Sequence, residues 1–273
     1  MHTEPYVPEL GIEYPPNPDD RMIEARVVRE VHVDENYAFL DKSLKFRLSR
    51  GLLYFGIFTI VFALSSALFG LSVKGRGVLR KHRALLKNGA MTASNHVHRW
   101  DFLFVLRATR FRAMYFPVKK EHLSGPDGRR IQLAGGIPVP GDIRTMRRFN
   151  EAFDEIRARK TWLHVFPEST RFDYFQPIRP FKKGVFTMAH RYDLPVVPMA
   201  FSYSKPRPTP ANLLRSARGK KRLPMITLRI GEPILPDKNL PRKEAVQKLR
   251  KDCHDAVVRL AGIRENRFPA EGD

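Results

Sequence analysis

The feature that most constrains the fold is an apolar segment, residues 51–73, which contains no charged side chain. About 20 consecutive apolar residues are enough to cross the hydrocarbon core of a bilayer as a helix. Basic residues flank the segment on both sides, so the positive-inside rule does not orient it. Two basic flanks favour a helix that dips into one leaflet at an anionic, cytoplasmic membrane face. We therefore expect membrane attachment, single-pass or monotopic; a helix buried in the core of a large domain is the alternative.

The charge balance adds a second constraint. The 49 Lys and Arg residues against 28 Asp and Glu residues give a formal net charge of +21. Such an excess predicts an anionic partner, which can be nucleic acid, an acidic membrane surface or a phosphorylated substrate. The basic residues are spread along the chain without an RNA-recognition signature, which makes nucleic acid the less favoured partner. A basic scaffold that binds membrane or nucleic acid without catalysis is the non-enzymatic alternative.

The length of 273 residues suits one α/β domain with an appendage. The organisation we expect is an irregular arm (1–40), a membrane-anchoring helical segment (41–73) and an α/β domain (74–273). Within the arm, residues 23–33 alternate well enough for a strand, although a short helix fits too. The N-terminus has no secretory signal pattern, and we find no cofactor fingerprint. The single cysteine, Cys253, excludes a disulfide framework and cannot form a metal site alone.

Short apolar runs and amphipathic segments follow the apolar segment. After a turn near Gly77, we expect a strand at 90–93, a helix from Asp101 closed by arginines, and further strands at 113–118 and 161–168. We also expect a helix at 144–159, a helix and a proline-terminated strand after Pro180, a strand from 225 and a last helix at 241–260. Residues 205–222 read as a basic loop that can meet lipid head groups or an acidic acyl carrier.

Chemistry is concentrated in the string A-S-N-H-V-H-R-W-D, which holds His96 and Asp101 five positions apart. In one regular helix such positions diverge by about 140°, so the two side chains meet only if His96 lies at or before the first turn. Asn95 is a plausible N-cap. A neutral imidazole at a helix N-terminus, steadied by a carboxylate, suits a general base. We assign no serine as the third member of a catalytic triad, so the nucleophile would be a substrate hydroxyl; His98 is the competing base.

A second polar cluster follows the strand predicted at 161–168, in the string F-P-E-S-T-R. Ligand-binding residues of α/β sheets gather at the carboxyl ends of strands, where this cluster falls. Glu168 can accept a hydrogen bond from a hydroxyl-bearing acceptor, and Arg171 can offer two parallel N–H groups to a phosphate.

Four strings, in order, resemble the conserved blocks of the glycerolipid acyltransferases, the lysophosphatidic acid acyltransferase (PlsC-like) family. N-H-x-x-x-x-D resembles block I, G-G-I-P-V block II, F-P-E-S-T-R block III and L-P-V-V-P-M-A block IV. Two positions depart from the family's pattern: Ser169 replaces a glycine in block III, and Gly141 stands where block II carries an arginine.

The resemblance implies roles for particular residues. His96 and Asp101, and not His98, match the catalytic pair. The acceptor would be held by Glu168, Ser169, Thr170 and Arg171. Lys120 matches a lysine-containing segment and would contact the substrate phosphate. Arg144, or else Arg147 or Arg148, would supply the cation that block II lacks.

The resemblance also implies an α/β fold with a mostly parallel sheet flanked by helices, and acyl transfer without metal or cofactor. Acyl-CoA or acyl-carrier protein would donate the fatty chain to a lysophospholipid hydroxyl. The acceptor we expect is 1-acylglycerol 3-phosphate, which gives phosphatidic acid in phospholipid biosynthesis. Because block II is altered, three other acceptors stay open: an amino-acid lipid, another lysophospholipid and glycerol 3-phosphate.

Overall fold

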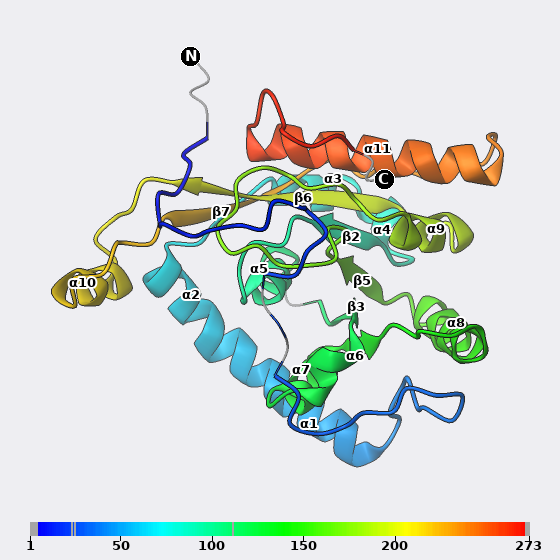
Figure 1. The fold of residues 1–273 in the computed structure, drawn as a ribbon. Coiled ribbons are helices and arrows are strands. Elements are labelled where there is room, and N and C mark those ends of the chain that lie inside the picture. Colours follow the sequence, from blue (N-terminus) through cyan, green and yellow to red (C-terminus); the bar gives the residue numbers. More distant parts are fainter. Residues whose placement is uncertain (1–4, 23, 25, 111, 271–273) are drawn as a thin grey trace.

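The structure, a computed structural model, describes residues 5–22, 24, 26–110 and 112–270, apart from the side chains of Val61 and Phe69. Within these residues, seven strands form one sheet in the order β1-β7-β6-β2-β5-β3-β4 (Figure 1). The strands are β1 (Ser72–Lys74), β2 (Met91–Ser94), β3 (Met114–Val118), β4 (Gly136–Pro138), β5 (Trp162–Val165), β6 (Val196–Ser204) and β7 (Met225–Ile230). Every neighbouring pair is parallel except β6–β7, which confirms the mostly parallel α/β sheet.

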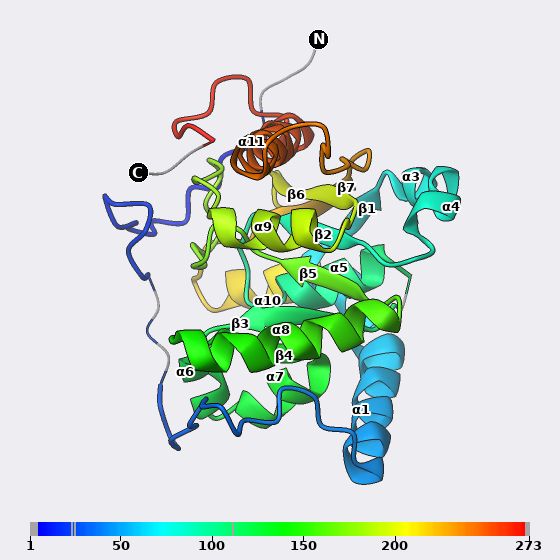
Figure 2. The ribbon, with the colours of Figure 1, turned by 90° about the vertical axis from the view of Figure 1, so that its right-hand side faces the viewer.

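Helices cover both faces of this sheet (Figures 1 and 2). One face packs against α8 (Ile143–Ala158), α9 (Lys183–Arg191) and α11 (Arg242–Ala261). The other packs against α5 (Asp101–Ala108) and the helical run α1 (Leu44–Gly56), η1 (Ile57–Val61) and α2 (Phe62–Phe69). Five short helices connect these elements: α3 (Arg76–Lys81), α4 (Arg83–Leu86), α6 (Lys120–Ser124), α7 (Gly128–Ala134) and α10 (Pro210–Ala217).

The helical spacing of apolar residues explains how the covering helices pack. In α8, Phe149, Phe153 and Ile156 recur at intervals of four and three, and all three are buried against the sheet. Asp142 caps the helix by accepting a hydrogen bond from the Thr145 amide at 2.9 Å. In α11, Cys253 lies on the buried face, and burial raises the pKa of its thiol. The thiol is therefore a small apolar component of the core.

Most of the apolar segment lies within one continuous helix with a π-turn, formed by α1, η1 and α2, and its most apolar 18-residue window has a mean hydropathy of 2.0. Among the described residues, this is the one helix that is long and apolar enough to cross a membrane. The core helix of a soluble protein can meet the same two criteria. Only 24% of its most apolar window is buried, so it is not an interior helix. The helix ends at Phe69, earlier than predicted, because Gly70 turns the chain with a φ of +55° and β1 then pairs with β7.

Polar contacts hold this helix along the domain. The Tyr54 hydroxyl donates to the carbonyl of Ala134 at 2.7 Å, and the Arg50 guanidinium donates to the carbonyl of Met114 at 3.3 Å. Further along, the Arg107 guanidinium at the end of α5 donates to the Ser65 hydroxyl at 2.7 Å. The helix that begins at Asp101 is thereby connected directly to α2.

Several expected elements differ in detail. The turn near Gly77 is replaced by α3 and α4, and the basic loop at 205–222 contains α10, which Thr209 caps. The strand predicted at 161–168 is shorter than expected and consists of β5 alone. It does not continue through Pro167, because proline has no N–H to donate to a neighbouring strand. Pro198 does not end its strand but lies inside β6, between two other strands. Proline is tolerated there because pairing with β7 starts one residue later, at Met199.

The N-terminal arm has no helix or strand in its described residues, and residues 23 and 25 of the strand or helix expected at 23–33 lie outside them. It crosses in front of the sheet, where the dark blue trace passes β6 and α5 (Figure 1). The Tyr14 hydroxyl donates to the Asp173 carbonyl at 2.8 Å, and its ring stacks on Phe172. Two further contacts tie residues 18 and 19 to the domain: Arg179 Nη1 donates to the Pro18 carbonyl at 2.9 Å, and Lys182 pairs with Asp19 at 2.6 Å.

Candidate active site

The site begins where β2 ends. Asn95 is fully buried, and its side-chain amide exchanges two hydrogen bonds with the backbone of Phe201, at 2.8 and 3.1 Å. These bonds extend the β2–β6 contact past the last paired residue. Helix α5 starts only at Asp101, so the prediction of Asn95 as the helix N-cap was wrong. Asn95 instead anchors the loop that carries His96.

The histidine–aspartate contact predicted from the spacing is present. His96 Nδ1 lies 3.0 Å from Asp101 Oδ2, and His96 precedes the first turn of α5, as the geometry requires. The same carboxylate oxygen accepts the amides of Val97 at 2.6 Å and His98 at 2.8 Å. Burial raises the pKa of Asp101, while these two backbone N–H groups oppose the rise and favour the carboxylate. Asp101 therefore organises the loop as well as orienting the imidazole.

The imidazole of His96 is held by the Asp101 carboxylate and by an aromatic ring, and part of it faces a pocket. Its ring stacks on Phe166, with centroids 3.9 Å apart and planes inclined by 14°. Its side chain is 23% exposed, toward a pocket that it helps to line. Burial, helped by the nearby charge of Arg171, holds the pKa of His96 well below 6.5. With Nδ1 directed at Asp101, a neutral ring presents Nε2 as the proton acceptor.

His98 has a different environment. Its ring stacks against Phe104 with centroids 5.5 Å apart, and its Nδ1 accepts the Trp100 amide at 3.2 Å. The side chain is buried, it is not among the residues that line the pocket, and burial lowers its pKa to about 4. The structure thus brings His96, and not His98, to the cavity.

Glu168 is buried beneath the site, with 2% of its side chain exposed. Its Oε2 accepts the His96 amide at 2.9 Å, and its Oε1 accepts the Arg179 amide at 2.9 Å. The guanidinium of Arg179, itself 1% exposed, pairs with Oε2 at 3.1 Å. Burial raises the pKa of Glu168, and Arg179 opposes that rise. Because Glu168 is buried and does not line the pocket, the structure does not bring it to the place of an acceptor hydroxyl; it accepts the backbone amide of His96 instead.

The loop after Glu168 does reach the pocket. Ser169, Thr170 and Arg171, the residues predicted to hold the acceptor, all line it. Ser169 has a φ of +69°, the left-handed region that favours glycine, which explains why the related pattern has glycine there. Arg171 Nε lies 2.8 Å from Asp173 Oδ1, an ion pair that fixes one edge of the guanidinium.

Two other predicted contacts lie elsewhere. Lys120 is exposed at the start of α6, and its neighbour Lys119 lines the pocket instead. Arg144 is exposed near the start of α8 and is not among the lining residues. The block II glycines serve packing: a Cβ on Gly135, where φ is +115°, would meet the Met114 carbonyl oxygen at 2.1 Å. Lys120 and Arg144 therefore do not contribute to this cavity.

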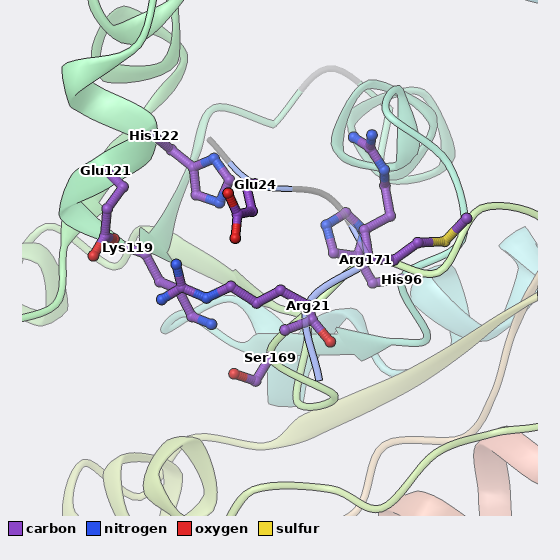
Figure 3. A pocket seen from close by; sticks show the side chains of 10 residues that line it. Arg21, Glu24, His96, Lys119, Glu121, His122, Ser169 and Arg171 are labelled. Carbon is purple, nitrogen blue, oxygen red and sulfur yellow. The ribbon is translucent and has the colours of Figure 1, made fainter. Parts of the chain in front are cut away.

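The pocket also contains residues that the sequence motifs did not indicate (Figure 3). Three come from the N-terminal arm and three from α6 or the residue before it. In the figure, Lys119, Glu121 and His122 form one side, and His96 and Arg171 lie on the other. The pocket is lined by Arg21, Met22, Glu24, His96, Lys119, Glu121, His122, Ser169, Thr170 and Arg171.

Comparison with known proteins agrees with this geometry. Residues 71–202, which contain all four strings, match the family model described as Acyltransferase. The fold is similar to that of the crystal structure of the 1-acyl-sn-glycerophosphate (LPA) acyltransferase, PlsC, from Thermotoga maritima. That match has a TM-score of 0.50 and 17% identity, and it covers 81% of this chain and 85% of that one. A comparison with curated protein sequences found no significant match.

Residues 71–202 therefore match an acyltransferase domain, and the chain has a fold similar to that of PlsC. The resemblance to the PlsC-like acyltransferases that the four strings predicted is confirmed.

Proposed function

We propose that this protein is a membrane-associated O-acyltransferase that moves a fatty acyl group from a thioester to a lysophospholipid hydroxyl. The acceptor that best fits is 1-acylglycerol 3-phosphate, with acyl-CoA or acyl-carrier protein as the donor. One observation carries the proposal: His96, oriented by Asp101 at 3.0 Å, is a neutral base facing a pocket lined by several cations.

The chemistry follows from the open face of the imidazole. Nε2 of His96 removes the proton of the acceptor hydroxyl as its oxygen attacks the thioester carbonyl. A carbon–oxygen bond forms, the carbon–sulfur bond breaks, and the imidazolium returns the proton to the leaving thiolate. Asp101 stabilises the positive charge on the ring between these steps. General-base action supplies roughly 10²- to 10⁴-fold, and holding both reactants together supplies much of the remainder.

The charges of the pocket support a phosphate-bearing acceptor. Arg171 keeps N–H groups beyond the one paired with Asp173, and Lys119 lies across the cavity from it. Arginine and lysine are the usual partners of phosphate oxygens. The Thermotoga protein with this fold is itself described as acting on 1-acyl-sn-glycerophosphate.

The exposed face of the long helix supports membrane attachment. Its outward apolar side chains recur at helical spacing, and each is between 43% and 73% exposed. Because Tyr54 and Arg50 bind the opposite face to the domain, the helix lies along the domain, which favours shallow insertion into one leaflet over a crossing. The apolar face consists of Leu44, Leu48, Leu52, Phe55, Ile60 and Leu64.

One feature of the pocket favours a second class of acceptor. Glu24 and Glu121 line the cavity beside the cations, and a pair of carboxylates suits the amino group of a zwitterionic head group. An acceptor such as a lyso-aminolipid would use the same chemistry.

The test is transfer by purified protein from labelled palmitoyl-CoA, and separately from palmitoyl-acyl carrier protein. The acceptors are 1-oleoylglycerol 3-phosphate, 1-oleoylglycerophosphoethanolamine, glycerol 3-phosphate and monooleoylglycerol. We expect the fastest transfer to 1-oleoylglycerol 3-phosphate, and none with His96→Ala. Faster transfer to the ethanolamine lipid would show that the acceptor belongs to the second class, the lyso-aminolipids. No transfer to any acceptor, together with tight binding of nucleic acid, would favour a scaffold.

A further inference from the structure

The N-terminal arm is tied down immediately beside the pocket. Pro18 and Asp19 bind Arg179 and Lys182, and the Asp20 carbonyl accepts the Thr170 hydroxyl at 3.5 Å. Arg179 is the same side chain that holds Glu168 under His96. The residue that follows this anchored segment is Arg21. Its position therefore depends on the same contacts that build the catalytic loop.

Arg21 points into the pocket, toward Lys119 (Figure 3). The two cations are close enough that the charge of Arg21, after burial, lowers the pKa of Lys119. In the described part of the chain, no carboxylate within ion-pair distance is recorded for either cation. Glu24 and Glu121 line the same cavity, and the charge of Glu121 partly opposes the lowering of the Lys119 pKa. Because neither carboxylate forms an ion pair with Arg21 or Lys119 in the described residues, the N–H groups of both cations are open to an anion.

Position 141, where block II would carry its cation, does not line this cavity. Gly141 has no side chain and is exposed, and the nearby Arg144 is exposed as well; neither lines the pocket. Arg21, which does line the pocket, comes instead from a segment far away in the sequence.

Resting on the proposed function, we propose that Arg21 of the N-terminal arm is an acceptor-specificity residue that binds the phosphate group of the lysophospholipid together with Lys119. A phosphomonoester carries up to two negative charges, which two adjacent cations match, and a neutral monoacylglycerol gains nothing from them. The arm thus selects the acceptor, and the loops after β2 and β5 supply the chemistry.

The same phosphate chemistry is present in the donor, since CoA carries phosphates. The experiment therefore measures KM separately for 1-oleoylglycerol 3-phosphate and for palmitoyl-CoA. Three variants are compared with the natural sequence: Arg21→Ala, Arg21→Lys and Arg26→Ala. Arg26 is a matched control because it is exposed on the same arm and does not line the pocket.

For Arg21→Ala we expect KM for 1-oleoylglycerol 3-phosphate to rise by about 10-fold or more, the loss typical of one charge-assisted contact, with kcat within about threefold. Arg21→Lys should recover most of this loss, and Arg26→Ala should match the natural protein. KM for palmitoyl-CoA should be the same in all four. An unchanged acceptor KM in Arg21→Ala, or a rise confined to palmitoyl-CoA, would overturn the inference.

A binding measurement separates this inference from the proposed reaction. The catalytically silent His96→Ala protein and the His96→Ala/Arg21→Ala double variant are titrated with 1-oleoylglycerol 3-phosphate and with monooleoylglycerol. We expect the second substitution to weaken binding of the phosphate lipid by about 10-fold or more and to leave monooleoylglycerol binding unchanged. Equal binding by the two proteins refutes the role of Arg21, whatever turnover shows. Weakened binding with no turnover in the natural protein supports Arg21 and refutes acyl transfer.

Discussion

The two sides of the pocket are built differently. The loops after β2 and β5 hold Asp101, Glu168 and Arg179 almost without solvent exposure, each connected by several hydrogen bonds. On the other side, Arg21 comes from an irregular arm and Lys119 precedes a short helix, and both reach solvent. The proposed base is thus placed by the rigid sheet, while the cations proposed to select the acceptor lie on segments that can vary without disturbing it.

In the largest expected effect, a substitution on one side of the pocket changes kcat, and a substitution on the other side changes KM for the acceptor. His96→Ala should reduce kcat by about 10³-fold or more, because it removes both the base and the aligned proton path. Lys119→Ala should instead raise the acceptor KM by about 10-fold, with little change in kcat. Steady-state kinetics with both substrates varied measure the two constants.

Two neighbouring residues serve as controls. His98→Ala should keep kcat within several-fold at temperatures where it is folded, because His98 does not line the pocket, and Lys120→Ala should behave as the natural protein does. Equal kcat losses in His96→Ala and His98→Ala would contradict our assignment of the base.

The second prediction concerns stability. Arg179→Met leaves the Glu168 carboxylate buried without its cation, so the free energy of unfolding should fall by about 3–5 kcal/mol. Adding Glu168→Gln to Arg179→Met should recover part of the loss. Lys119→Met, on the other side of the pocket, should change stability by about 0.5 kcal/mol or less. Denaturant titrations provide all three values, and a similar loss at both positions would refute the contrast.

The third prediction concerns pH. The neutral form of His96 is the base, so activity is present above its pKa and lost as pH falls through it. Since burial and Arg171 hold that pKa well below 6.5, the acid limb of the kcat/KM profile should lie below pH 6.5. Arg171→Gln removes a neighbouring positive charge and should move the limb to higher pH. A limb that stays in place would show that Arg171 does not act on the imidazole.

The smallest expected effect tests the backbone of the loop. Ser169→Gly should raise stability by about 1 kcal/mol, because glycine adopts the φ of +69° without strain, and should keep most of the activity. Thermal unfolding of the two proteins measures the difference. A destabilised glycine variant would mean that the serine side chain makes a contact that outweighs the strain.

The contact between His96 and Asp101 was predictable because it is local. A spacing of five residues together with the start of a helix leaves one arrangement in which His96 and Asp101 touch, and that arrangement is observed. Ser169 and Arg171 were also predictable, since the end of a strand and a proline place them at the sheet edge. The block pattern could name Glu168 but not its partner, because Arg179 reaches it through tertiary folding across an irregular loop.

Other contributions to the site had no local signal. Lys119 and Lys120 are adjacent, and only the start of α6 decides which of them faces the cavity. Arg21 belongs to a proline-rich arm with no periodic pattern, so its path follows from contacts with Asp173 and Arg179. The one relevant signal in the sequence is that Gly141 stands where block II carries an arginine, and it does not point to Arg21.

The sequence by itself determined the α/β alternation, the apolar helix, the four strings and the histidine–aspartate pair, because periodicity and short spacing act within a few residues. The tertiary structure alone decided that Glu168 lies under the loop of His96, that the long helix lies along the domain and that the arm brings Arg21 to the pocket. These depend on contacts between residues that are tens of positions or more apart, where side-chain packing and the pairing of buried charges select one arrangement from many.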